Sequence, residues 1–151
     1  YESCKIKKLV VEKDEKEKNL RKILNFGHTF AHAFESTLGY SKKLNHGEAV
    51  ILGMKTALKF SFLTKKLNQK SYNFIIKHFE NSKLPGSIKS YFKLKHLNQI
   101  LHFMEKDKKN NSNNIKLVLL KNLGKPIIHN ENNKYKLRLF LKKELSYGNL
   151  N

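Results

Sequence analysis

The chain has 151 residues, of which 39% are hydrophobic, and this length suits one domain or one half of a two-domain enzyme. Its formal net charge is +19, yet only Arg21 and Arg138 among the 31 basic residues are Arg, and the Lys residues are spread along the whole chain between many Asn. Because a nucleic-acid-binding surface is more often a clustered, Arg-rich patch, the composition argues against a nucleic-acid partner. The positive charge would attract anionic substrates, including phosphates.

The single cysteine, Cys4, excludes an internal disulfide framework and a zinc site made of several cysteines. Residues 1–8 contain neither an initiator Met nor the apolar stretch of a signal peptide. Every apolar run is far shorter than the roughly 18 residues that span a membrane. We therefore expect that the chain begins inside a longer protein and has no membrane partner. The expected location is the cytoplasm, with a plastid or another organelle as the alternative.

The first half of the chain predicts three helices. They are expected over residues 3–12, 20–38 and 46–64. A charged connector at 12–19 separates the first two, and Gly39 is suited to cap the C-terminus of the second. After a loop at 40–45, Asn45 and Glu48 form the pattern of a capping box at the start of the third helix.

The second half predicts three more helices and two short strands. The helices are expected over residues 68–82, 95–106 and 134–146. A polar loop at 108–114 leads to strand candidates at 115–120 and 126–129, which a turn at Gly124 would join into a hairpin. The expected fold class is therefore mainly α, a multi-helix domain with one small β-hairpin.

The segment expected as a helix over 20–38 carries polar residues at helical spacing. On a continuous helix they fall on one stripe, made of Arg21, Asn25, His28, His32 and Glu35. Burying five polar groups is costly unless each has a partner, and a ligand or metal is one way to supply partners. The alternative is a helix interface of mutually satisfied polar side chains. By spacing alone, His28 and His32 could bind one metal.

A third histidine strengthens the case for a metal site. His46 opens the next helix, so antiparallel packing would return it to the stripe, and Gly47 and Gly53 would let the two helices approach closely. Glu48 has a sufficient role as the capping-box acid and is not expected to be a ligand. The remaining histidines are expected to be ordinary surface or core residues, namely His78, His96, His102 and His129.

The sequence from Arg21 to Glu35 has the pattern R-x-x-L-N-x-G-H-T-x-x-H-A-x-E, and His46 to Met54 has the pattern H-G-E-A-V-x-x-G-M. Together they resemble the zinc-site signature of the 3-dehydroquinate synthases, which are sugar-phosphate cyclases. Further matching residues lie upstream and downstream, namely Lys7, Val10, Val11, Asp14, Glu17 and the run Asp107-Lys108-Lys109. The resemblance covers roughly residues 3–130 and is most specific over 7–54.

The resemblance implies conversion of 3-deoxy-arabino-heptulosonate 7-phosphate to 3-dehydroquinate with loss of phosphate, a carbon–oxygen lyase reaction of the shikimate pathway to chorismate and the aromatic amino acids. It implies zinc, or a similar divalent metal, and NAD as cofactors. It also implies that this C-terminal helical domain packs against an upstream NAD-binding α/β domain, and that the full enzyme is a homodimer. The chain itself contains no Gly-rich phosphate loop.

By position, the resemblance makes His28 and His46 the zinc ligands, in place of the pair that spacing alone suggests. His32 becomes a hydrogen-bonding or proton-transfer group beside the substrate. The third zinc ligand of the family is a Glu upstream of this region, and two protein ligands are too few for a catalytic zinc. We therefore expect the isolated chain to have little or no activity.

The same resemblance assigns Lys7, Arg21 and Asn25 to catalysis and to binding the substrate's carboxylate and hydroxyls. Arg suits a carboxylate because its planar fork can bind both oxygens. Lys108 or Lys109 would approach the phosphate or carboxylate, and a solvated basic loop is the alternative for these two.

Two departures from the family pattern and three alternatives stay open. Ala31 stands between His28 and His32 where the family usually has Gly, so its methyl group could crowd a helix contact, and Asn19 replaces another common Gly.

The first alternative function is that of a related sugar-phosphate cyclase or metal-dependent polyol dehydrogenase. The second is a basic module that binds nucleic acid or an acidic surface, and the third is an inactive remnant that keeps the fold.

Overall fold

The structure is a computed structural model that describes residues 1–18, 20–82, 84–107 and 114–146. Its helices are α1 (Glu2–Lys13), η1 (Leu20–Asn25), α2 (His28–Thr37), α3 (His46–Leu63), α4 (Gln69–Asn81), η2 (Ile88–Ser90), η3 (Leu94–His96), α5 (Leu97–Lys106) and α6 (Lys134–Ser146), where η marks a 3-10 helix. Its strands, β1 (Ile115–Asn122) and β2 (Lys125–Glu131), form a two-stranded antiparallel sheet. The expected fold class, mainly α with one hairpin, is confirmed.

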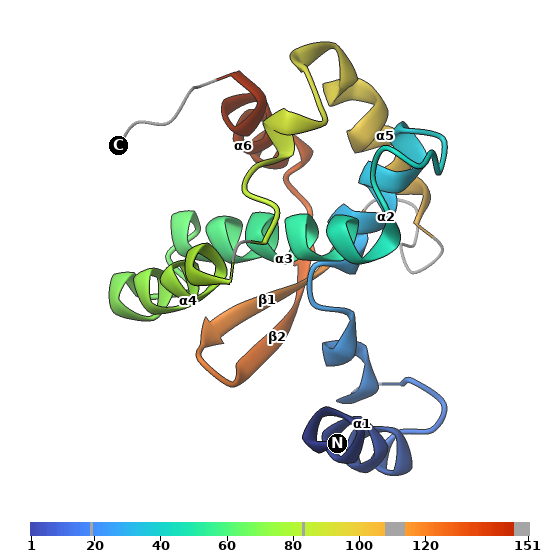
Figure 1. Cartoon of the computed structure of the whole chain (residues 1–151), viewed down its shortest axis with the longest axis vertical. Helices are drawn as coiled ribbons and strands as arrows, with labels where there is room; N and C mark the ends of the chain where they lie inside the picture. The colour runs from blue at the N-terminus through green and yellow to red at the C-terminus, as the bar shows by residue number, and fades with distance from the viewer. Residues whose placement is uncertain (19, 83, 108–113, 147–151) are drawn as a thin grey trace.

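Helix α2 lies at the centre of the domain, packed against α3 and α5 (Figure 1). Phe30 and Phe34, four residues apart, point from one face of α2 into the core, and the Phe34 ring lies 5.1 Å from that of Phe92. Full burial of such a side chain contributes roughly 1.5–3 kcal/mol. The core therefore fixes the rotation of α2, and the opposite face, with His32, stays exposed.

The prediction of one continuous helix over 20–38 is wrong. The segment divides into η1 and α2, and Gly27 between them has a left-handed backbone with φ of 82°. A Cβ at Gly27 would lie 2.4 Å from the backbone nitrogen of Met54, so only glycine allows the chain to approach α3 here. Because of this break, Arg21 and Asn25 do not continue the helical stripe that begins at His28.

The contact between α2 and α3 depends on a second glycine. A Cβ at Gly53 would lie 2.3 Å from the carbonyl oxygen of Gly27 and 3.2 Å from the Cβ of Ala31. The expected role of Gly53 in close approach is thus confirmed, and the methyl group of Ala31 fits because it faces a glycine. The same expectation for Gly47 is wrong, because a Cβ there would meet only the Asn45 side chain, at 3.5 Å.

Hydrogen bonds fix both ends of the loop between α2 and α3. At the start of α3, the Glu48 amide donates to Asn45 Oδ1 (2.9 Å), and the Asn45 amide donates to Glu48 Oε2 (3.0 Å), which confirms the capping box. At the end of α2, Gly39 has a φ of 63° and the Tyr40 amide donates to the Glu35 carbonyl (2.9 Å). The loop therefore holds His46 at a fixed place beside α2.

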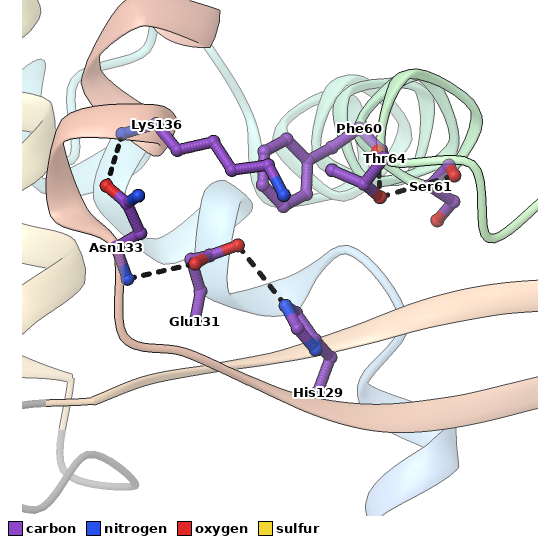
Figure 2. Close-up of polar contacts among 7 residues, drawn as sticks. All are labelled: Phe60, Ser61, Thr64, His129, Glu131, Asn133 and Lys136. Atoms are coloured by element: carbon purple, nitrogen blue, oxygen red, sulfur yellow. Dashed lines mark hydrogen bonds and ion pairs between the residues drawn. The ribbon is translucent and has the colours of Figure 1, made fainter.

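The hairpin packs on α3 through one face of β1. Ile115, Leu117 and Leu119 alternate along the strand and are buried, and the Leu120 amide donates to the buried Ser61 hydroxyl of α3 (3.1 Å). Figure 2 shows the connection from β2 to α6, where the Asn133 amide donates to the buried carboxylate of Glu131 (2.9 Å).

Helix α1 has no buried residue. It contacts η1 and lies apart from the rest of the domain (Figure 1). Its apolar residues Ile6 and Leu9 are 59% and 56% exposed. Across the residues that the structure describes, no helix combines the length and the apolar character needed to cross a membrane.

Candidate metal and substrate site

Three histidines meet where α2 and α3 begin. His28 is the first residue of α2, His32 lies one turn later, and His46 is the first residue of α3. The ring centroid of His28 lies 5.7 Å from that of His32 and 6.3 Å from that of His46. The close crossing of the two helices at Gly27 and Gly53 thus brings together residues that are far apart in sequence.

The rings of His28 and His46 each have an oxygen within hydrogen-bonding distance of Nδ1. Nδ1 of His28 lies 3.4 Å from the carbonyl oxygen of Phe26, and Nδ1 of His46 lies 3.0 Å from Oε1 of Glu35. Metal-binding histidines typically donate one ring N–H to a carbonyl or carboxylate, which leaves the other nitrogen to the metal. His28 and His46 both have such a partner, and both are the ligands that the resemblance predicted.

The donor set fits a divalent metal that prefers imidazole nitrogen. Within the described part of the chain, no three His, Cys, Asp or Glu side chains are grouped so that they could hold a metal. A catalytic zinc with three protein ligands would thus need one from beyond the described residues.

A cavity of about 540 Å³ opens beside His32 and His46. Glu35, Tyr40 and Asp107 also line it. Nδ1 of His32 lies 3.8 Å from the largely buried carboxylate of Asp107, at the end of α5. His32 therefore faces the cavity with a carboxylate beside its ring.

A second cavity, of about 550 Å³, lies between α1 and η1. The residues that line it include four of those predicted for the site, namely Lys7, Arg21, Asn25 and His28. The break at Gly27 separates Arg21 and Asn25 from the helix that carries His28, but folding gathers them with Lys7 around one space. His28 lines this cavity and also contacts His32 and His46, so it joins the two halves of the site.

Arg21 and Asn25, which line this second cavity, make hydrogen bonds to the connector between α1 and η1. The Arg21 amide donates to the Asp14 carboxylate (3.0 Å), and the Arg21 guanidinium donates to the Glu15 carbonyl (2.7 Å). Asn25 Nδ2 donates to the Glu17 carboxylate (2.7 Å). Since a guanidinium has five N–H donors, the Glu15 contact orients Arg21 while using only one of them.

The sequence reasoning assigned no role to Asp14, Glu17 or Glu35. The sequence nevertheless points to these residues, because Asp14 and Glu17 fit the family pattern and Glu35 has the helical spacing of the histidines. Lys108 and Lys109, predicted to approach the phosphate or carboxylate, lie outside the described residues.

Comparison with known proteins gives one family. The family model described as "3-dehydroquinate synthase C-terminal" matches residues 1–110. The chain is 59% identical over 146 residues to the 3-dehydroquinate synthase of Pelagibacter ubique (strain HTCC1062), covering 97% of this chain and 40% of that protein. It is 43% identical over 128 residues to the 3-dehydroquinate synthase of Endomicrobium trichonymphae, covering 84% and 34%. The chain therefore spans well under half the length of these relatives.

A solved structure shares the fold. It is a 2-deoxy-scyllo-inosose synthase, crystallised with carbaglucose-6-phosphate, NAD+ and Co2+. It superposes with a TM-score of 0.64 at 24% identity, over 85% of this chain and 35% of that one. The two proteins thus share the arrangement of helices and hairpin.

Proposed function

This chain belongs to the 3-dehydroquinate synthase C-terminal family, and on that basis we propose that it is the metal- and substrate-binding domain of an enzyme that converts 3-deoxy-arabino-heptulosonate 7-phosphate to 3-dehydroquinate. An upstream domain would supply the NAD site and the third metal ligand. The observation that carries the proposal is the meeting of the histidine cluster and the Lys7, Arg21 and Asn25 group at His28.

In this proposal His28 and His46 hold the metal. Bound there, a zinc ion would act as a Lewis acid on the substrate's hydroxyl and carbonyl oxygens. NAD, held by the upstream domain, would supply transient oxidation of a substrate hydroxyl. The resulting ketone would acidify the neighbouring C–H and make loss of phosphate feasible.

Arg21 and Lys7 would bind the substrate's carboxylate, and Asn25 would bind its hydroxyls. The contacts of Arg21 with Glu15 and of Asn25 with Glu17 support this, because a side chain that is already oriented loses less freedom when it binds. The net charge of +19 would attract a substrate that carries both carboxylate and phosphate.

His32 would hold or transfer a proton at a substrate oxygen. Its place on the cavity wall supports this role, and so does the Asp107 carboxylate that lies 3.8 Å from its Nδ1. Lys108 and Lys109, just beyond Asp107 in sequence, stay proposed as groups for the phosphate or carboxylate.

The test is phosphate release from the heptulosonate phosphate by the full-length protein, with its NAD and zinc. Arg21→Lys should lower kcat/KM about tenfold or more, because a hydrogen bond to a charged group contributes roughly 1.5–3 kcal/mol and about 1.4 kcal/mol is tenfold. The matched control is Arg138→Lys, at the only other Arg, exposed on α6, which should leave activity unchanged. Release from other phosphorylated sugars but not from this one would overturn the proposed substrate.

A further inference from the structure

Glu35 is a buried acid beside a predicted metal ligand. The residue is 7% exposed, on α2, and its Oε1 lies 3.0 Å from Nδ1 of His46. Removing an ionised carboxylate from water costs several kcal/mol unless a partner compensates. The imidazole supplies such a partner, and the contact is therefore more than a surface ion pair.

The chemistry of the two groups fixes the direction of the hydrogen bond. An ionised carboxylate can only accept, so Nδ1 of His46 must carry the hydrogen. In the neutral ring, Nε2 then has the lone pair. A metal binds that lone pair, so the contact with Glu35 selects the tautomer in which Nε2 is the free nitrogen of His46.

From this geometry we infer that Glu35 is a positioning residue for the metal site, which sets the tautomer and ring orientation of His46 without itself binding metal. The inference rests on the proposed function, because it takes His46 to be a ligand. Metal-site partners of this kind typically account for about 10- to 100-fold in metal affinity.

The backbone around Glu35 supports a fixed geometry. Its carbonyl accepts a hydrogen bond from the Tyr40 amide (2.9 Å), which turns the chain into the loop that returns at His46. The His46 side chain is 64% exposed, whereas the Glu35 side chain is 9% exposed. Glu35 thus supplies a rigid acceptor on the protein side, and the outer part of the ring stays open to the cavity.

Glu48 offers a matched control. It is also an acid, and it is much closer to His46 in sequence, but its carboxylate accepts a hydrogen bond from the Asn45 amide in the capping box. Glu48→Met loses the hydrogen bond from the Asn45 amide and should lower helix stability. It retains the backbone amide that donates to Asn45 Oδ1, so α3 should still begin at His46 and the His46 contact with Glu35 should be kept. Glu35→Met removes the acceptor with an apolar side chain of similar length, and Glu35→Gln retains an amide oxygen that can accept.

The first measurement is the tautomer of His46 by ¹⁵N NMR of its ring in the full-length protein without metal. At pH about 8.5 an ordinary imidazole, with a pKa of about 6.5, is neutral. We expect the Nδ1–H form in the parent and in Glu48→Met, and a shift toward the Nε2–H form in Glu35→Met. An Nε2–H form in the parent would overturn the inference.

The second measurement is zinc affinity of the same variants, by competition with a chelator. Glu35→Met should lose about 10- to 100-fold, Glu35→Gln less, and Glu48→Met should match the parent. Parent-like affinity in Glu35→Met would overturn the inference and leave the proposed function standing. A folded parent that binds no zinc would overturn the proposed function and the metal role of Glu35 with it.

Discussion

The contact between α2 and α3 gives the sharpest prediction about stability. Gly→Ala inside a helix ordinarily stabilises by about 0.5–1 kcal/mol, because glycine loses more backbone entropy on folding. At Gly53 the new Cβ would lie 2.3 Å from the Gly27 carbonyl oxygen and 2.9 Å from the Ala31 nitrogen. Both neighbours are backbone atoms, so the helices must separate by about 1 Å, and overpacking of this kind costs roughly 1–3 kcal/mol.

The clash should exceed the gain in helix propensity, so Gly53→Ala should lower the free energy of unfolding by about 1–2 kcal/mol. For a chain of this size, that corresponds to about 2–8 °C in Tm. Urea denaturation followed by circular dichroism measures the difference. Restoring the family's usual glycine in Ala31→Gly/Gly53→Ala should recover only part of the loss, because the contact with the Gly27 oxygen remains.

The control is Gly47→Ala in the same helix, where the added Cβ meets only Asn45 Oδ1 at an ordinary 3.5 Å. Its free energy of unfolding should stay within about 0.5 kcal/mol of the parent. If Gly53→Ala is as stable as Gly47→Ala, the α2–α3 contact is looser than described. The close helix crossing would then not explain why His28 lies near His46.

Three further predictions follow from other parts of the molecule. Asn45→Ala should lower the free energy of unfolding by about 0.5–2 kcal/mol in urea denaturation, because it removes the N-cap of α3, whereas an unchanged midpoint would contradict that role. Burial raises the pKa of the Tyr72 phenol above its usual 10.0 in the folded chain, so unfolding releases a proton and stability falls as pH rises through that value. Tyr72→Phe keeps the stack on Phe62 and should lose less stability between pH 9 and 11, and parallel pH profiles would contradict this. The 151-residue chain alone should release no phosphate from the heptulosonate phosphate, and turnover would show that no upstream domain is needed.

Local signals in the sequence were enough to predict much of the fold. The capping box of Asn45 and Glu48 predicted the start of α3 at His46, because both hydrogen bonds lie within four residues. The hairpin was predicted from strand candidates at 115–120 and 126–129 and a turn at Gly124, and the structure gives Gly124 a φ of 69°. In each case the residues that determine the structure are neighbours in the chain.

The break at Gly27 could not be predicted in the same way. Periodicity from residue 20 to 38 favours a continuous helix, and the reason for the interruption is the backbone of Met54, which lies close only after folding. The contacts of Asn25 with Glu17 and of His46 with Glu35 join residues 8 and 11 positions apart, so spacing alone gave no role to these two acids.

The binding of a metal by His28 and His46 is tested most directly by the zinc content of the full-length protein, measured by elemental analysis. The parent is compared with His28→Ala and His46→Ala, and His78→Ala, on the exposed side of α4, is the control. We expect about one zinc per chain in the parent and in the control, and loss of zinc in both site variants. Zinc retained in His28→Ala and His46→Ala, or a folded parent without zinc, would contradict it.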